Sequence, residues 1–125
     1  MDLGYVPVTT TTAHIASRLR RVLPNDRVLD DPTTILPYAY DASFWSLRAL
    51  RMPEVVVVPD TTEEVAAVVR LADETGTPIV ARGAGTGQTG GAVPTRGGIV
   101  VSFARMRRIH EIDRRNLQVL VEPGV

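Results

Sequence analysis

The sequence predicts an α+β fold: a small parallel βαβ sheet with flanking helices, followed by a further strand and a β-hairpin. Three observations support this. Residues 54–58, "EVVVV", have the length and β-branching of a buried parallel strand. An amphipathic segment separates this run from a second apolar stretch at 78–81. Near the end of the chain, two apolar segments flank a polar turn at 114–116.

The N-terminal part predicts one helix and little other regular structure. A helix is expected over 13–23, because apolar residues recur there at helical spacing and Pro24 follows. These apolar residues are Ile15, Leu19, Val22 and Leu23. Prolines and aspartates, then aromatic residues, crowd 24–53, so this segment is expected to be mostly irregular.

The middle of the chain predicts a strand, a helix and a second strand. Thr61 is the expected N-cap of the helix, Glu64 completes a capping box, and Gly76 is the expected C-cap. The expected apolar stripe consists of Val65, Val68, Val69 and Ala72. The crossover between the two strands is expected to be right-handed. The residues that follow the second strand lie at its carboxyl end, where open α/β sheets bind ligands.

The last third predicts a strand over 98–103, "GIVVSF", and a hairpin formed by "RIHEID" and "LQVLVE". The run "RMRRIHEIDRR" is locally basic, but acidic residues interrupt it and aromatic residues are lacking. It therefore favours a solvated hairpin over a nucleic-acid site.

Composition narrows the classes of function. The 125 residues are 44% hydrophobic and 22% charged, with zero formal net charge, so no nucleic-acid partner is expected. The lack of cysteine excludes disulfides and cysteine-bound metal within the chain.

His14 and His110 have no partners at metal-binding spacing, so no metal site is expected. No signal peptide or transmembrane segment is evident, which predicts a cytoplasmic location or a peripheral one at the inner face of the membrane.

The stretch "ARGAGTGQTGGAVP", residues 81–94, has five glycines between positions 83 and 91. Residues 85–90 match G-x-G-x-x-G, but a Rossmann loop must also open a helix. Further glycines and a proline fall where that helix would run. Relative to alanine, each glycine destabilises a helix by about 1 kcal/mol and each proline by about 3 kcal/mol, so no helix is expected. A P-loop is excluded because the chain has no lysine.

The remaining interpretation is a nest, in which glycines at positive φ let successive backbone N–H groups converge on an anion. Gly85 and Gly87 are expected at such positions, and Gly97 outside the nest. Arg82 would stand at the loop entrance as a charge partner, and Thr86 and Thr89 would add hydroxyl donors. The alternative is a long flexible connection between two strands.

Several motifs occur in the order and spacing of a known family. They are "YAYDAS", "VVVVP…EEV", "RGAGTGQTGGA", "GGIVVS", "RMRRIHEID" and "VEPGV". Over residues 38–125 the chain resembles the first half of the FAD-binding domain of the vanillyl-alcohol-oxidase/p-cresol methylhydroxylase (PCMH) type. Within that superfamily it is most similar to glycolate oxidase FAD subunits and D-lactate dehydrogenases. Residues 1–37 would then be a helix and an irregular lead-in.

The resemblance implies roles for individual positions. The glycine loop would hold the FAD pyrophosphate, the proline after the first strand would contact the adenosine, and the final "PGV" would lie near the flavin. The implied FAD-binding residues are Pro59, Arg82, Gly83, Ala84, Gly85, Thr86, Gly87, Thr89, Gly90, Gly91, Pro123, Gly124 and Val125. Gln88 departs from the family's common "GLSGG". Because no histidine lies between His14 and His110, noncovalent FAD is expected.

The resemblance also implies FAD-dependent oxidation of a small 2-hydroxy acid, of glycolate or D-lactate type, to the 2-keto acid. Electrons would pass to an iron–sulfur subunit, a quinone or a cytochrome. Catalytic residues would lie beyond position 125, and the ending "LVEPGV" leads us to expect an incomplete domain. Alternatives are a flavin enzyme of the alkyl-dihydroxyacetone-phosphate synthase kind, an inactive fragment, or a nucleotide-binding module.

Overall fold

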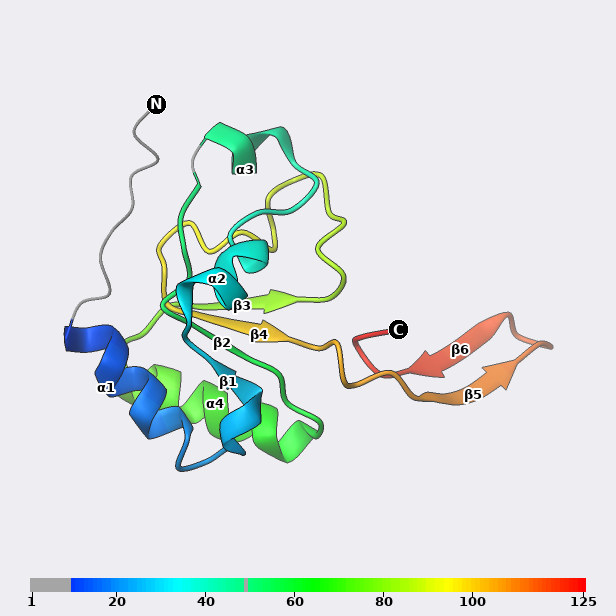
Figure 1. The fold of residues 1–125 in the computed structure, drawn as a ribbon. Coiled ribbons are helices and arrows are strands. Elements are labelled where there is room, and N and C mark those ends of the chain that lie inside the picture. Colours follow the sequence, from blue (N-terminus) through cyan, green and yellow to red (C-terminus); the bar gives the residue numbers. More distant parts are fainter. Residues whose placement is uncertain (1–9, 49) are drawn as a thin grey trace.

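A computed structural model describes residues 10–48 and 50–125, and its α+β architecture agrees with the predicted fold class (Figure 1). In chain order the elements are α1 (Thr10–Leu19), the 3₁₀ turn η1 (Asn25–Arg27), β1 (Val28–Leu29), α2 (Pro32–Ile35), the 3₁₀ turn η2 (Leu36–Tyr38), α3 (Phe44–Arg48), β2 (Val55–Val57), α4 (Thr62–Thr75), β3 (Ile79–Arg82), β4 (Ile99–Ser102), β5 (Ile109–Asp113) and β6 (Gln118–Val121).

The main sheet has the strand order β1-β2-β4-β3. Strands β2, β4 and β3 are parallel, whereas β1 is antiparallel to β2 at one edge. The predicted strand–helix–strand unit is present, but β4 lies between its two strands. Val100 of β4 is consequently level with Val56 on one side and Val80 on the other. Strand β4 is buried along its whole length because it is paired on both sides.

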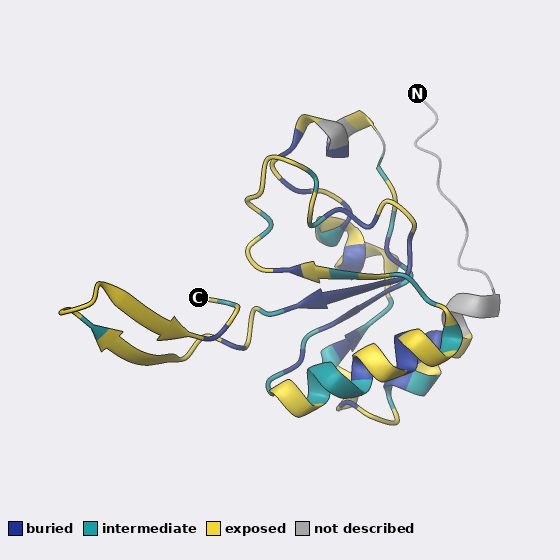
Figure 2. Ribbon diagram, turned by 180° about the vertical axis from the view of Figure 1, so that it is seen from behind, coloured by how far each residue is buried: buried dark blue, intermediate teal, exposed yellow. Residues whose placement is uncertain are grey.

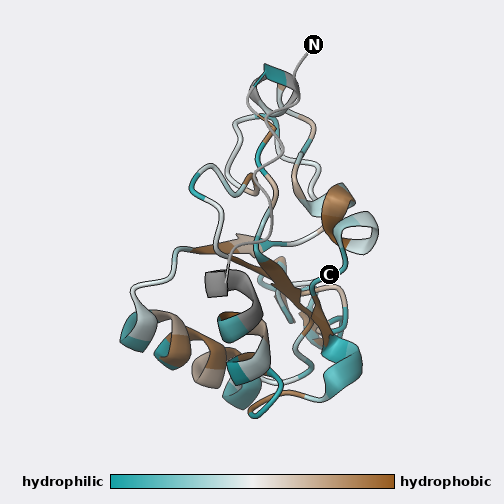
Figure 3. Ribbon diagram, turned by 60° about the vertical axis from the view of Figure 1, so that its left-hand side comes forward, coloured by the Kyte–Doolittle hydropathy of each residue, from teal (hydrophilic) through white to brown (hydrophobic). Residues whose placement is uncertain are grey.

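Helices cover both faces of this sheet (Figures 1 and 3). One apolar cluster joins α1 and α4 to alternate residues of β2 and β4. Its buried members are Ile15, Ala16, Leu19, Leu23, Val28, Val55, Val57, Val68, Leu71, Ala72, Ile99 and Val101. On the opposite face Ile35 of α2 packs with Val56 and Val100. The period-two alternation of the strands therefore supplies both layers of the core.

Helix α4 has the predicted caps. The Thr61 hydroxyl accepts a hydrogen bond from the Glu64 N–H, and Gly76 adopts the left-handed conformation at φ +61°. The Glu64 carboxylate accepts from the Asp60 N–H, one residue before the N-cap, whereas a capping box would use the Thr61 N–H. The predicted stripe needs one correction, because Val69 is 47% exposed. Leu71 is buried in its place because the sheet contacts a different side of the helix.

The N-terminal predictions were partly wrong. Helix α1 ends at Leu19, and the chain then turns, which leaves Val22 exposed while Leu23 stays in the core. The segment 24–53 is not mostly irregular, because it contains β1 and several short helical turns. These elements are too short for periodicity to reveal them, and β1 forms only by pairing with β2.

The predicted hairpin, β5 with β6, extends away from the main sheet (Figures 1 and 2). An irregularity in its register between Ile109 and Glu111 brings Ile109 and Ile112 onto the same face, opposite Val121 and Val119. All four side chains are exposed. In the described part of the chain, no helix combines the length and the apolar character that a bilayer span requires.

Candidate functional site

The glycine-rich loop connects β3 to the parallel strand β4 without a helix. Bends and turns occupy 83–98, which confirms the expectation that no Rossmann helix follows the glycines. The loop leaves the carboxyl end of β3 and runs on the α2 side of the sheet (Figure 1). Most residues between positions 83 and 91 are exposed.

The positive φ angles in the loop lie partly at other positions than expected. Gly85 has φ +72° and Gly90 has φ +79°, but Gly87 has no positive φ, so the expectation for Gly87 was wrong. Gly97 and Gly98 also have positive φ, where the chain turns into β4. A Cβ on Gly98 would lie 2.1 Å from the Pro78 carbonyl oxygen, so this turn also needs glycine for space.

The middle of the loop faces open space. A Cβ placed on Gly87 or on Gly91 would meet no atom within 4 Å. The neighbouring side chains of Thr86 and Thr89 are exposed. Backbone N–H groups and hydroxyls are therefore accessible here without an overlying side chain, which is the character that a phosphate-binding loop requires.

Arg82 lies beneath the loop. Its side chain is buried, Nη1 donates to the Tyr40 carbonyl at 2.7 Å, and Nη2 donates to the Pro37 carbonyl at 3.1 Å. The guanidinium also lies 5.5 Å from the centre of the Tyr38 ring. A Cβ on Gly85 would clash with Nη2. In this structure the guanidinium is thus held under Gly85 and is not free at the loop entrance.

Asp41 and Ser43 are buried beneath the second half of the loop. Asp41 Oδ1 accepts from the Ser43 N–H at 2.8 Å, and Ser43 Oγ lies 3.7 Å from the place of a Cβ on Gly90. Contacts from Ser43, helped by the Ala92 N–H and the charge of Arg82, hold the pKa of Asp41 below its usual range. Neither residue can be identified from periodicity or spacing in the sequence, and only the motif "YAYDAS" points to this segment.

The final "PGV" segment reaches the start of the loop. The Pro123 carbonyl oxygen lies 3.9 Å from the place of a Cβ on Gly83. Gly124 donates from its N–H to the Met106 carbonyl, and its missing side chain lets the Phe103 carbonyl approach. Val125 is 63% exposed. The fold thus brings together two segments that lie forty residues apart in sequence.

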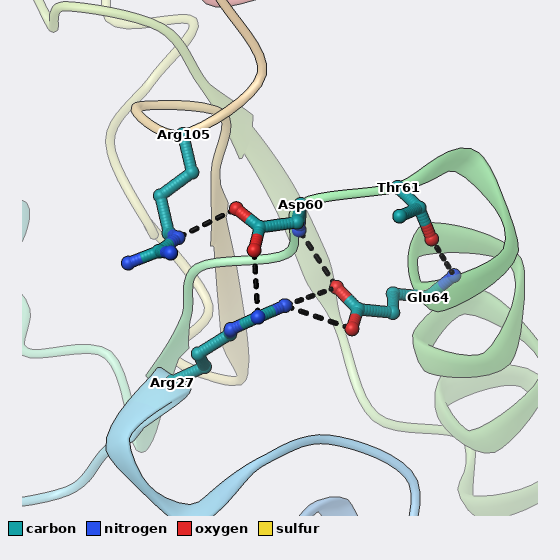
Figure 4. A network of polar contacts seen from close by, with 5 residues as sticks. All are labelled: Arg27, Asp60, Thr61, Glu64 and Arg105. Carbon is teal, nitrogen blue, oxygen red and sulfur yellow. Dashed lines mark hydrogen bonds and ion pairs between the residues drawn. The ribbon is translucent and has the colours of Figure 1, made fainter.

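The remaining predicted position, Pro59, is fully buried at the end of β2. Beside it lies a cluster of charged side chains (Figure 4). Arg27 pairs with Asp60 at 2.6 Å and with Glu64 at 2.8 Å, and Arg105 pairs with Asp60 at 2.5 Å. The hydrogen bond from Arg105 is the main reason why the pKa of Asp60 is lowered. The cluster joins η1, the turn before α4 and the segment after β4.

A model of the FAD binding domain matches residues 53–125, which is more than half of the chain. The chain belongs to the FAD binding domain family. The chain is similar to the glycolate oxidase subunit GlcD of Bacillus subtilis, with 37% identity over 91% of this chain. It is also 37% identical, over 85% of this chain, to the D-lactate dehydrogenase of Anaerostipes hadrus. FAD is therefore the cofactor that the chain's family implies.

Solved structures confirm the resemblance to the PCMH type. Substrate-bound p-cresol methylhydroxylase matches 95% of this chain with a TM-score of 0.79 and 29% identity. An alkyldihydroxyacetonephosphate synthase matches 97% with a TM-score of 0.78 but 22% identity, which shows the fold alone. The chain spans about a quarter of these proteins, 24% of the B. subtilis subunit and 24% of p-cresol methylhydroxylase.

Proposed function

We propose that the whole protein is an FAD-linked oxidoreductase that oxidises a small 2-hydroxy acid, of glycolate or D-lactate type, to the 2-keto acid. The names of the related glycolate oxidase subunit and D-lactate dehydrogenase support this substrate class. Electrons would leave through an iron–sulfur subunit, a quinone or a cytochrome. When bound, FAD supplies the two-electron chemistry, and the protein supplies binding and orientation.

The present chain is proposed to supply the part of the site that holds the FAD pyrophosphate. The observation that carries this is the open backbone around Gly87 and Gly91 at the carboxyl end of a parallel strand. Exposed N–H groups and the hydroxyls of Thr86 and Thr89 would contact phosphate oxygens. Pro123, Gly124 and Val125 would lie nearer the flavin, and Pro59 would contact the adenosine. The absence of histidine between positions 14 and 110 supports noncovalent FAD.

A second candidate is a module that binds a nucleotide without turnover. The exposure of the loop between positions 83 and 91 favours it, because this chain forms one wall of a site and does not enclose a ligand. The two candidates differ in whether flavin remains bound and is reduced by substrate.

A chimera tests the proposed half-site. Residues 1–125 would replace the matching segment of the Escherichia coli glycolate oxidase subunit GlcD. The two proteins are 34% identical over 98% of the present chain. We expect the purified chimera to contain flavin that glycolate reduces. Gly85→Val should remove the flavin. Gly76→Val is the matched control, because Gly76 also has positive φ but lies outside the loop. Equal flavin loss in both variants would show that the loop only connects two strands and does not bind the flavin.

A further inference from the structure

The geometry points to Arg82 and Asp41 as positioning residues that hold the glycine loop against the segment 37–43 and do not themselves contact the FAD phosphates. The inference deepens the proposed function, because a preset loop matters for a ligand that binds there. It can nevertheless be tested without any ligand.

Arg82 anchors the first half of the loop. Its two terminal nitrogens donate to the carbonyls of Pro37 and Tyr40, which lie more than forty residues earlier in the chain. Apart from η2, no helix or strand ladder holds the residues between α2 and α3, so such bonds fix a segment that would otherwise be loosely held. A guanidinium with several rigidly arranged donors suits this bridge, whereas the single ammonium of lysine does not reproduce it.

Gly85 and Arg82 depend on one another. A Cβ on Gly85 would lie 2.2 Å from Arg82 Nη2 and 2.4 Å from Cζ. Any side chain at position 85 must therefore displace the guanidinium from the two carbonyls. The glycine thus serves a second purpose besides its positive φ, namely to leave space for the arginine head beneath the loop.

Asp41 anchors the second half. Its carboxylate accepts a hydrogen bond from the Ser43 N–H and faces the Ala92 N–H. The positive charge of Arg82 also stabilises the ionised carboxylate. Ser43 in turn lies directly beneath Gly90. The loop is therefore supported near Gly85 and near Gly90, and we expect the stretch between these two glycines to keep its shape before a ligand arrives. Such preorganisation lowers the entropy lost on binding.

A direct phosphate contact by Arg82 is the competing interpretation. It requires the guanidinium to leave two carbonyls, the neighbouring carboxylate and a buried position. Arg82 as a whole residue is only 9% exposed. Buried donors that lose their partners pay a desolvation penalty, so the positioning role agrees better with the observed contacts.

Amide hydrogen exchange of this chain without ligand is the test. Arg82→Met should accelerate exchange about tenfold in segments 38–43 and 84–92, and leave β2 and β4 unchanged, because the loss is local. Arg82→Lys should be intermediate. Arg96→Met is the matched control, since Arg96 is exposed in the same β3–β4 connection, and should exchange like the wild type. Unchanged exchange in Arg82→Met would overturn the inference.

Coupling between the two residues gives a second measurement. Gly85→Ala should accelerate loop exchange strongly in the wild-type background but much less in Arg82→Met, because the clash has gone and only the backbone strain remains. Additive effects would contradict the proposed contact. If Arg82→Met unfolds the chain, Asp41→Asn replaces it and should accelerate exchange around Ala92.

Titration with inorganic pyrophosphate separates this inference from the proposed function. Weaker binding by Arg82→Met with unchanged exchange would show a direct charge contact and overturn the positioning role. Faster exchange in Arg82→Met supports positioning even if the wild type binds no pyrophosphate, a result that would count against the proposed function alone.

Discussion

Gly85 and Gly87 look equivalent in "GAGTGQTG", but they differ in backbone conformation and in surroundings. Gly85 has positive φ and lies over Arg82, whereas Gly87 has neither constraint. Gly85→Ala should therefore destabilise the chain by about 1–3 kcal/mol, the usual range for a strained backbone position. Gly87→Ala should remain within about 0.5 kcal/mol of wild type. Urea unfolding followed by circular dichroism measures both, and equal midpoints would contradict the assignment.

Asp60 makes stability depend on pH. Arg105 donates a hydrogen bond to its carboxylate and lowers its pKa, and the charge of Arg27 adds to this. A carboxyl whose pKa is lowered by folding stabilises the folded state above its unfolded pKa, near 4, and loses that contribution as pH falls toward the folded pKa. The urea midpoint of the wild type should fall below about pH 4.

Asp60→Asn should show a smaller fall of the midpoint over the same pH range. Asp73→Asn is the control, because it removes one exposed carboxylate from α4 without touching the cluster of Arg27, Asp60, Glu64 and Arg105. The role of Asp60 would be refuted by identical pH profiles of Asp60→Asn and the wild type.

At the scale of elements, α4 depends on its N-cap. The Thr61 hydroxyl accepts the Glu64 N–H, so Thr61→Ala should destabilise the chain by about 1 kcal/mol. The adjacent Thr62→Ala makes the same chemical change at an exposed position in the first turn and should be nearly neutral. Chemical denaturation of the two variants compares them directly. A larger effect at position 62 would place the helix start elsewhere.

Helix α4 and the hairpin could be predicted because their signals are local. Capping residues, apolar periodicity and a polar turn all lie within a few residues of the structure they produce. The β1 strand could not be predicted, because two residues show no period and their conformation depends on pairing with β2. The irregular register in the hairpin was equally invisible, although it decides which face carries Ile112.

For the whole molecule, the hairpin leaves an apolar face uncovered. This face consists of Ile109, Ile112, Val119 and Val121, with exposures of 56%, 59%, 56% and 39%. Exposed apolar patches promote association, so the chain alone should bind the dye ANS and self-associate at micromolar concentration.

The double variant Ile112→Thr/Val119→Thr should reduce both dye fluorescence and association. Val22→Thr removes an exposed apolar side chain in the turn after α1, away from the hairpin, and is the control. Sedimentation velocity and ANS titration give the two measurements. A monodisperse wild type without ANS binding would show that the face is not adhesive.

The chain alone should bind FAD only weakly. Its loop is exposed between positions 83 and 91, whereas a cofactor site usually encloses most of its ligand. We expect a dissociation constant above about 1 μM, which corresponds to a binding free energy weaker than about −8 kcal/mol. Calorimetric titration of the chain with FAD, with Gly85→Val as the nonbinding control, measures it. Submicromolar affinity would show that these residues form a complete FAD module.

The sequence by itself determined the elements with local signals, the absence of a helix after the glycines, and the resemblance to the FAD binding domain family. Only the tertiary structure decided that β4 lies between β2 and β3, that Arg82 lies beneath Gly85, and that Asp41 and Ser43 are buried near the second half of the loop. The physical reason is distance along the chain. The contacts of Arg82 with Pro37 and Tyr40 join residues more than forty positions apart, and no local pattern records which carbonyls a buried guanidinium will find once the sheet has formed.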